Sequence, residues 1–187
     1  MAQKRKDRNG LIAGFKASDL VFLDESGCNT NMTRRYAYSL GGSRAVDSAP
    51  LSKPKNTTIL SSIQLDGTLH YTTFSGGTTV ERFKQYLESD LLPHLNGNSV
   101  LIMDNMKSHH VKAVKNLLDS SGVRYIYLPP YSPDLNPIEK LWSKVKSFLR
   151  KFKARTLDTL PNAIQNAFHS VTVSDCSGWF RFCGYAL

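Results

Sequence analysis

The sequence predicts a mixed α/β fold, in which a sheet carries helices on its faces. Two short runs, 20–23 and 100–103, are apolar at every position, which is typical of strands buried on both faces. Two β-rich runs within 57–74 flank Asp66-Gly67, and this dipeptide between such runs indicates a hairpin. Helical patterns fall between and after these strands. The expected order is strand, two-stranded hairpin, helix, strand, helix, strand, helix.

The chain opens with a polar, basic segment, residues 1–18, which we interpret as a tail or the remnant of a linker. The first strand, 20–23, leads directly into Asp24. The stretch 33–50 mixes arginine, tyrosine and glycine, and it predicts an exposed loop or short hairpin. Its arginines are candidate phosphate contacts, although a solvated loop explains each one equally well: Arg34, Arg35 and Arg44.

After the hairpin, Thr78 and Glu81 have the spacing of a capping box and open a helix that Pro93 ends. The second apolar run leads into Asp104. A helix is then expected from about His109 to Leu118, followed by a strand over 123–128.

The stretch 128–146, LPPYSPDLNPIEKLWSKVK, reads as a rigid loop followed by a helix. Four prolines restrict the loop, Asn136 is a good N-cap, and Pro137 fits the first helical position. The apolar positions of this helix form one stripe: Ile138, Leu141, Trp142, Val145, Leu149 and Phe152.

A last helix is expected over 156–171, and the aromatic C-terminus should pack on the domain. We therefore divide the chain into a tail (1–18), a main domain (19–152) and a helical extension (153–187).

Composition narrows the class of protein. The chain has 187 residues, 41% of them apolar, which fits a globular domain with a sizeable core. The formal net charge of +9 favours a polyanionic partner, and nucleic acid is favoured over a membrane. Its longest apolar runs fall short of the ~18 residues that a membrane span needs. Three cysteines without a CxxC pair indicate reduced thiols rather than a disulfide framework or a zinc site.

Three acids follow or flank predicted strands in a way that could bring them together: Asp24, Asp104 and Glu139. If the first two strands are parallel neighbours, both aspartates project at the same edge of the sheet. Carboxylates packed together repel one another, and a divalent cation relieves that repulsion. A set of oxygen ligands suits Mg²⁺ or Mn²⁺, and two such ions would clamp a phosphoryl transfer.

Other interpretations of these acids stay open. Glu139 also has the spacing to cap the helix by bonding back to the N–H of Asn136. Glu25 lies beside Asp24, but side chains alternate across a strand, so only one of the two can face the site. Asp134, in SPDLNP, is better explained as a turn residue.

Four motifs carry a family resemblance: FLDESG, IMDNMKSHH, LPPYSPDLNPIEKLW and GWFRFCGY. They resemble the catalytic domain of mariner-type DDE transposases, and most closely their bacterial insertion-sequence branch. The resemblance implies a ribonuclease H-like fold with a five-stranded sheet. It also implies that Asp24, Asp104 and Glu139 form a catalytic triad that binds two Mg²⁺ or Mn²⁺ ions. Asn105 and His109 match the family pattern DN-x-x-x-H, in which His109 would orient the scissile phosphate, support Asp104, or serve the structure alone.

The resemblance implies metal-dependent cleavage of double-stranded DNA at transposon ends and strand transfer into target DNA. It also implies a homodimer that acts in the cytoplasm, associated with the nucleoid. Family members carry an N-terminal helix-turn-helix region, and fewer than about twenty residues precede the first strand here. That region is therefore expected from another reading frame. The candidate DNA contacts on the basic helix are Lys140, Lys144, Lys146, Arg150 and Lys151.

Two alternatives remain at this stage. A catalytically inactive relative would keep the basic helix and bind DNA without cutting it. A ribonuclease H-like nuclease would keep the fold and the metal ions but act on other nucleic acids.

Overall fold

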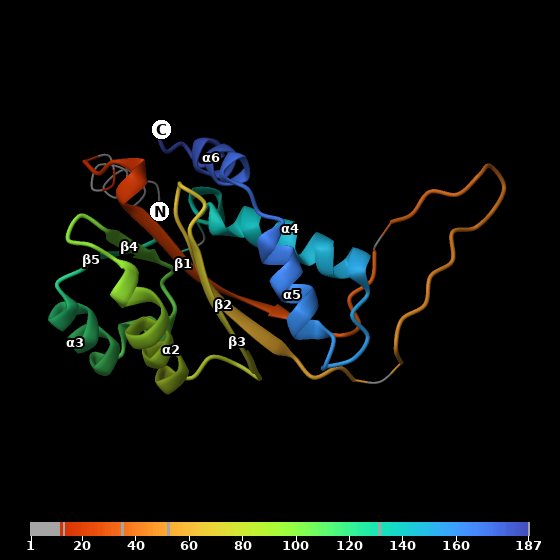
Figure 1. The fold of residues 1–187 in the computed structure, drawn as a ribbon, viewed down its shortest axis with the longest axis horizontal. Coiled ribbons are helices and arrows are strands. Elements are labelled where there is room, and N and C mark those ends of the chain that lie inside the picture. Colours follow the sequence, from red (N-terminus) through yellow and green to blue (C-terminus); the bar gives the residue numbers. More distant parts are fainter. Residues whose placement is uncertain (1–11, 13, 35, 52, 131, 187) are drawn as a thin grey trace.

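The computed structural model describes residues 12, 14–34, 36–51, 53–130 and 132–186. These residues form one mixed five-stranded sheet in the order β3-β2-β1-β4-β5, with helices on both faces (Figure 1). The strands are β1 (Leu20–Cys28), β2 (Thr57–Ile63), β3 (Leu69–Ser75), β4 (Val100–Met103) and β5 (Arg124–Tyr127). The predicted sheet class and strand order along the chain are confirmed.

The helices of the described residues fall into two groups. The α-helices are α2 (Val80–Tyr86), α3 (Lys112–Ser121), α4 (Ile138–Phe152), α5 (Leu160–His169) and α6 (Val173–Phe182). The short turns are η1 (Ala17–Asp19), η3 (Leu92–His94), η4 (Lys107–His110) and η5 (Pro133–Leu135), which are 3₁₀, and η2 (Leu87–Leu91), which is a π-turn continuing α2.

Strand β1 lies at the centre of the sheet and has two different neighbours. It runs antiparallel to β2 and parallel to β4, with Leu23 opposite Met103. The two apolar runs are thus parallel neighbours, as the convergence of Asp24 and Asp104 requires. The expectation that Asp24 ends its strand is wrong, because β1 continues to Cys28 through its pairing with β2. Asp24 instead marks the point where β1 loses its partner β4.

The two-residue alternation of β1 divides the core into two halves. Leu20 and Phe22 belong to a cluster formed with α4, α5 and α6. Val21 and Leu23 belong to a second cluster formed with α2 and α3. By the same alternation, Asp24 faces the side of α4 and Glu25 faces the side of α2 and α3.

Several helix boundaries differ from the sequence prediction. The N-cap of α2 is Thr79, whose hydroxyl accepts from the N–H of Arg82, rather than Thr78. The helix expected from His109 begins only at Lys112, after a 3₁₀ turn. Pro137 occupies the cap position of α4, so the helix starts at Ile138 without a side-chain cap from Asn136. All the stripe residues of α4 are buried except Phe152, which is 46% exposed at the last turn.

The C-terminal region contains two helices where the sequence predicted one. Helix α5 is shorter than the expected 156–171, and α6 follows it after a capping box made by Thr172 and Asp175. Phe180 of α6 packs edge-on against Phe22 of β1, with ring centroids 5.3 Å apart. At the other end of the chain, Ile12 and Ala17 are buried in the same cluster.

The segment between β1 and β2 contains no strand among its described residues and projects as a long arm (Figure 1). Arg155 ties its base to the domain by donating to the carbonyls of Thr30, Met32 and Ser48. Arg34 and Arg44 are exposed on this arm, and Arg35 lies outside the described residues. In the part of the chain that the structure describes, every helix is too short or too polar to cross a membrane.

The stripe of α4 predicts a contrast between two positions. Leu149→Ala should lower the free energy of unfolding by about 2–5 kcal/mol, because Leu149 is 2% exposed and its removal leaves a cavity. Phe152→Ala should cost far less, because nearly half of that side chain is already in water. Urea denaturation of both variants measures the difference, and equal costs would contradict the burial described here.

Candidate active site

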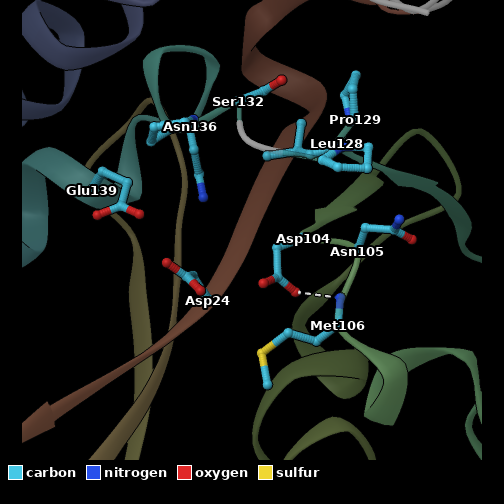
Figure 2. Close-up of a pocket in the computed structure, with 11 residues that line it drawn as sticks. Asp24, Asp104, Asn105, Met106, Leu128, Pro129, Ser132, Asn136 and Glu139 are labelled. Carbon is cyan, nitrogen blue, oxygen red and sulfur yellow. Dashed lines mark hydrogen bonds between the residues drawn. The ribbon is translucent and has the colours of Figure 1, made fainter. Parts of the chain in front are cut away.

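The three predicted acids line one pocket of about 370 Å³ (Figure 2). Asp24 comes from the middle of β1, Asp104 follows β4, and Glu139 lies in the first turn of α4. In Figure 2 the carboxylate of Asp24 lies between those of Asp104 and Glu139. The other walls of the pocket come from the proline-rich loop and the residues after β4: Asn105, Met106, Leu128, Pro129, Pro130, Ser132, Pro133 and Asn136.

Asp24 is the most buried of the three acids, with 9% of its surface exposed. Its Oδ2 accepts a hydrogen bond of 3.0 Å from the indole N–H of Trp142, which belongs to the buried stripe of α4. The pKa of Asp24 is raised to about 7, chiefly by burial and also by the nearby charges of Glu139 and Asp104, against the lowering effect of hydrogen bonds from the backbone of Glu25 and from Trp142. The structure thus holds a carboxylate whose negative charge is unfavourable in the absence of a cation.

Asp104 is oriented by two donors on one of its oxygens. Its Oδ1 accepts from the backbone N–H of Met106 at 3.1 Å and lies 2.9 Å from Nδ1 of His109. The other oxygen points toward Asp24 (Figure 2). One oxygen is therefore fixed by the protein while the other faces the pocket.

Glu139 reaches the pocket because the proline-rich loop sets where α4 begins. The backbone N–H of Asn136, which a capping Glu139 would have to bond, donates instead to the carbonyl of Pro133 at 3.1 Å. The capping-box explanation therefore does not describe this helix.

Asn136 lines the pocket, is 4% exposed, and has an Oδ1 without a hydrogen-bond partner. Asp134 lies exposed in the turn η5, as expected.

The acids suit a hard divalent cation in chemistry and in charge. Their ligand atoms are all carboxylate oxygens, which Mg²⁺ and Mn²⁺ prefer. A cation would also offset the burial and the repulsion that raise the pKa of Asp24. Within the described ranges, no three His, Cys, Asp or Glu side chains stand close enough to hold a single ion. The side chains would therefore have to draw together around bound metal.

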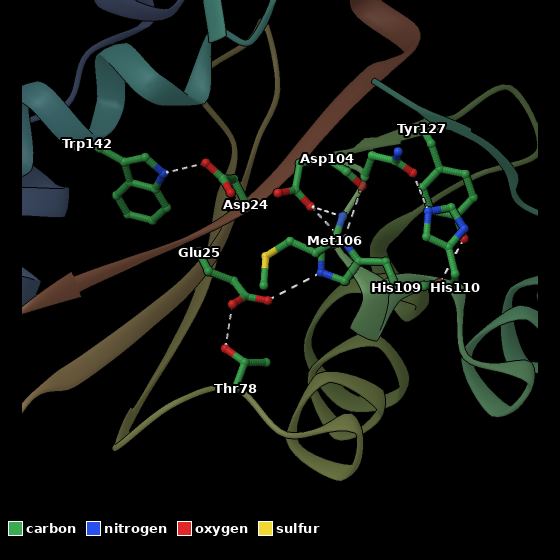
Figure 3. A network of polar contacts seen from close by, with 10 residues as sticks. Asp24, Glu25, Thr78, Asp104, Met106, His109, His110, Tyr127 and Trp142 are labelled. Atoms are coloured by element: carbon green, nitrogen blue, oxygen red, sulfur yellow. Dashed lines mark hydrogen bonds and ion pairs between the residues drawn. The ribbon is translucent and has the colours of Figure 1, made fainter. Parts of the chain in front are cut away.

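Glu25 lies on the opposite face of β1 and joins a second polar network (Figure 3). Its Oε2 accepts a hydrogen bond of 2.6 Å from Thr78, and its Oε1 lies 3.3 Å from Nε2 of His109. His109 is fully buried and stacks on Phe83, with centroids 4.3 Å apart. Burial alone would lower the pKa of His109, but its bonds to Asp104 and Glu25 outweigh burial and raise the pKa to about 9. The histidine is thus an imidazolium between two carboxylates at neutral pH.

The remaining predicted residues lie in different surroundings. Asn105 is exposed in the wall of the pocket and contacts His110. On α4, Lys140 lies over the ring of Phe182 and Lys144 pairs with Asp175. Lys146 and Arg150 are half-buried, and Lys151 is exposed. A groove of about 520 Å³ between α4 and α6 includes Lys140, Lys144 and Lys151.

Sequence reasoning missed three contacts around these acids: Trp142 with Asp24, Thr78 with Glu25, and Glu25 with His109. Trp142 was assigned to the core on its helical spacing. A signal existed, since a buried indole N–H usually finds an acceptor, but nothing in the sequence named Asp24 as that acceptor. Thr78 was assigned to a helix cap.

Asp24→Asn should stabilise the metal-free protein, and the gain should depend on pH. The carboxyl has a folded pKa of about 7 against an ordinary value of 3.8, so folding favours its protonated form. Stability therefore falls as pH rises from about 4 to 7, and the asparagine variant escapes that fall. The gain should reach a few kcal/mol at most above pH 7 and vanish near pH 4, roughly 1.4 kcal/mol per pKa unit. Denaturation in EDTA at several pH values measures it, and a pH-independent gain contradicts the assignment.

Comparison with known proteins identifies relatives over most of the chain. It is 30% identical over 83 residues to the transposable element Tc1 transposase of Caenorhabditis elegans, a match that covers 44% of this chain and 30% of that protein. The structure superposes on the pre-cleavage Mos1 transpososome with a TM-score of 0.76 and 18% identity, over 95% of this chain and 55% of the other.

The Mos1 paired-end complexes with Mg and with Mn both give a TM-score of 0.72. The complex with Mg matches at 18% identity over 97% of this chain and 58% of that chain, and the complex with Mn at 19% over 95% and 55%. These matches confirm the ribonuclease H-like fold. The chain spans just over half the length of these Mos1 chains and under a third of the Tc1 protein.

A family model described as the DDE superfamily endonuclease matches residues 19–161, which include β1, β4, the proline-rich loop and all three acids. Because this match covers most of the chain, the protein belongs to the DDE superfamily of endonucleases.

Proposed function

We propose that this chain is the catalytic domain of a DNA transposase, which cleaves DNA at transposon ends and joins the freed end to target DNA. The convergence of Asp24, Asp104 and Glu139 on one pocket carries this proposal. The family match to DDE endonucleases and the similarity to the Tc1 and Mos1 transposases support it. The net charge of +9 suits a phosphodiester substrate.

In this proposal the three acids hold two Mg²⁺ or Mn²⁺ ions. Asp24 lies between the other two carboxylates in Figure 2, so the three side chains together would hold the ions. Bound there, such ions supply Lewis-acid activation of the attacking and leaving oxygens of the phosphodiester. Trp142 fixes one oxygen of Asp24, and Met106 and His109 fix one oxygen of Asp104. The metal-containing structures of Mos1 agree with this choice of ion.

Double-stranded DNA would approach along the face of α4 that begins at Glu139. Lys146 and Arg150 follow Glu139 at seven and eleven residues, which places all three on one side of an α-helix. Phosphates of a duplex bound at the acids would meet these two cations. Lys140, Lys144 and Lys151 lie on the adjacent side, toward α6. The exposed Arg34 and Arg44 are further candidates on the arm.

The proposal also includes the family branch, the oligomeric state, the location and the domain division that the sequence predicts. The motifs LPPYSPDLNPIEKLW and GWFRFCGY favour the bacterial insertion-sequence branch. We propose a homodimer that works in the cytoplasm at the nucleoid, with a helix-turn-helix half encoded in another frame. We also propose that the chain divides into a tail (1–18), a catalytic domain (19–152) and a helical extension (153–187). The similarity to Mos1 complexes with transposon ends supports DNA as the partner.

Removal of each acid provides the central functional test. Asp24→Ala, Asp104→Ala and Glu139→Ala should each reduce Mg²⁺- or Mn²⁺-dependent nicking of supercoiled plasmid by about a hundredfold or more. Asp134→Ala, which removes an exposed acid from the neighbouring turn, is the matched control and should keep activity. Undiminished nicking by the three variants would rule out the proposal.

Faster cleavage of RNA–DNA hybrid than of duplex DNA by the wild-type chain would favour the ribonuclease alternative. Binding to DNA without any cleavage would favour the inactive relative.

A second test concerns the DNA path. Lys146→Ala combined with Arg150→Ala should weaken binding to a DNA duplex and reduce the slope of log affinity against log salt by about two. Lys144→Ala should change the slope less, because the Lys144 ammonium is already paired with Asp175. Fluorescence anisotropy over a salt series measures both, and an unchanged slope for the double variant would remove this face from the DNA path.

A further inference from the structure

A network of polar side chains on the α2 and α3 side of β1 shares Asp104 with the pocket of acids. His109 is fully buried in it, and Thr78, Glu25 and Asp104 are partly buried. The network begins at Thr78 and Glu25, passes through His109 and ends at Asp104 (Figure 3). These residues come from three separate segments, β1, the turn before α2 and the stretch after β4, and Glu25 is 84 positions from His109 in the sequence. A polar group removed from water lowers the stability of the fold unless it finds a hydrogen-bonding partner. In this row of four residues each side chain has such a partner.

We propose that Glu25 and Thr78 are positioning residues for metal binding, which act through His109 to hold Asp104 in its ligating orientation. This inference rests on the proposed function of the three acids and assigns a role to residues on the other face of β1.

The hydrogen bonds define how the orientation is transmitted. The Thr78 hydroxyl donates to Oε2 of Glu25, which leaves Oε1 toward Nε2 of His109 at 3.3 Å. With one ring nitrogen held by Glu25, the other, Nδ1, is directed at Oδ1 of Asp104 at 2.9 Å. Oδ1 is then occupied by His109 and by the N–H of Met106, so only Oδ2 is left to face the pocket.

Packing keeps the imidazole from leaving this position. The ring of Phe83, from α2, stacks on His109 with an interplanar angle of 21°, and the Tyr127 hydroxyl donates to the His109 carbonyl at 2.8 Å. The His109 side chain is fully buried and that of Glu25 is 12% exposed. The orientation of Asp104 is therefore set from behind the sheet, in the way that outer hydrogen bonds orient metal-ligating groups in other proteins.

The test is Mn²⁺ binding to the full chain, measured by isothermal titration calorimetry without DNA. Glu25→Ala should weaken Mn²⁺ binding by about tenfold or more, and Thr78→Val should weaken it by a smaller factor. Thr78→Ser retains the hydroxyl and should restore the affinity to within about twofold of wild type. Glu88→Gln, which alters a surface acid paired with Lys84, is the matched control and should bind as wild type does.

The outcomes separate this inference from the proposed function. If wild type binds Mn²⁺ and Asp104→Ala does not, while Glu25→Ala binds as wild type does, the positioning role is overturned and the metal site stands. If wild type does not bind Mn²⁺, both are overturned. Thermal denaturation checks that each variant folds, and Glu25→Gln replaces Glu25→Ala if the latter does not. Glu25→Gln keeps a hydrogen-bonding oxygen but loses the charge, so it should bind Mn²⁺ with an affinity between those of wild type and Thr78→Val.

Discussion

The burial of the Asp24 carboxylate in the middle of the sheet is the constraint on which the site depends. Strand β1 carries this acid past the end of β4, so Asp24 keeps β2 on one side and faces the pocket on the other. Water is largely excluded there, and this burial raises the pKa of Asp24, with a smaller contribution from the two further acids nearby. A protein gains nothing in stability from such a cluster. The divalent cations of the proposed function would offset this cost.

Helix α4 links the site to the core. Its buried stripe packs against β1, and the same stripe presents the indole of Trp142 to Asp24. Its first turn carries Glu139, whose position follows from the proline-rich loop that sets the start of the helix. A shift of α4 against the sheet would therefore move Glu139 and release Asp24 together. The contacts that pack α4 on the sheet are therefore the same contacts that position Asp24 and Glu139 in the pocket.

Much of the fold could be predicted because its signals are local, and the convergence of the three acids on one pocket follows from the order of the predicted strands. Apolar runs marked β1 and β4, Asp66-Gly67 marked the hairpin, and prolines marked the start of α4. The extension of β1 beyond Asp24 could not be predicted, since residues 25–28 follow the strand only through hydrogen bonds to β2.

The network behind the sheet escaped prediction for a related reason. Glu25, Thr78 and His109 meet through contacts between residues 53 and 84 positions apart, and no periodicity records such a pairing. Alternation along β1 predicted only that one of Asp24 and Glu25 would face the pocket, and the family motif favoured Asp24; neither indicated what Glu25 would meet. Helix α6 was missed although Thr172 and Asp175 have the spacing of a capping box.

The most direct test of the central claim is the anomalous diffraction of Mn²⁺ in crystals of this protein. The account predicts two peaks about 3.5–4 Å apart, with Asp24 contacting both, Asp104 contacting one and Glu139 the other. Ordered Mn²⁺ elsewhere on the protein, with no peak among these three carboxylates, would contradict it.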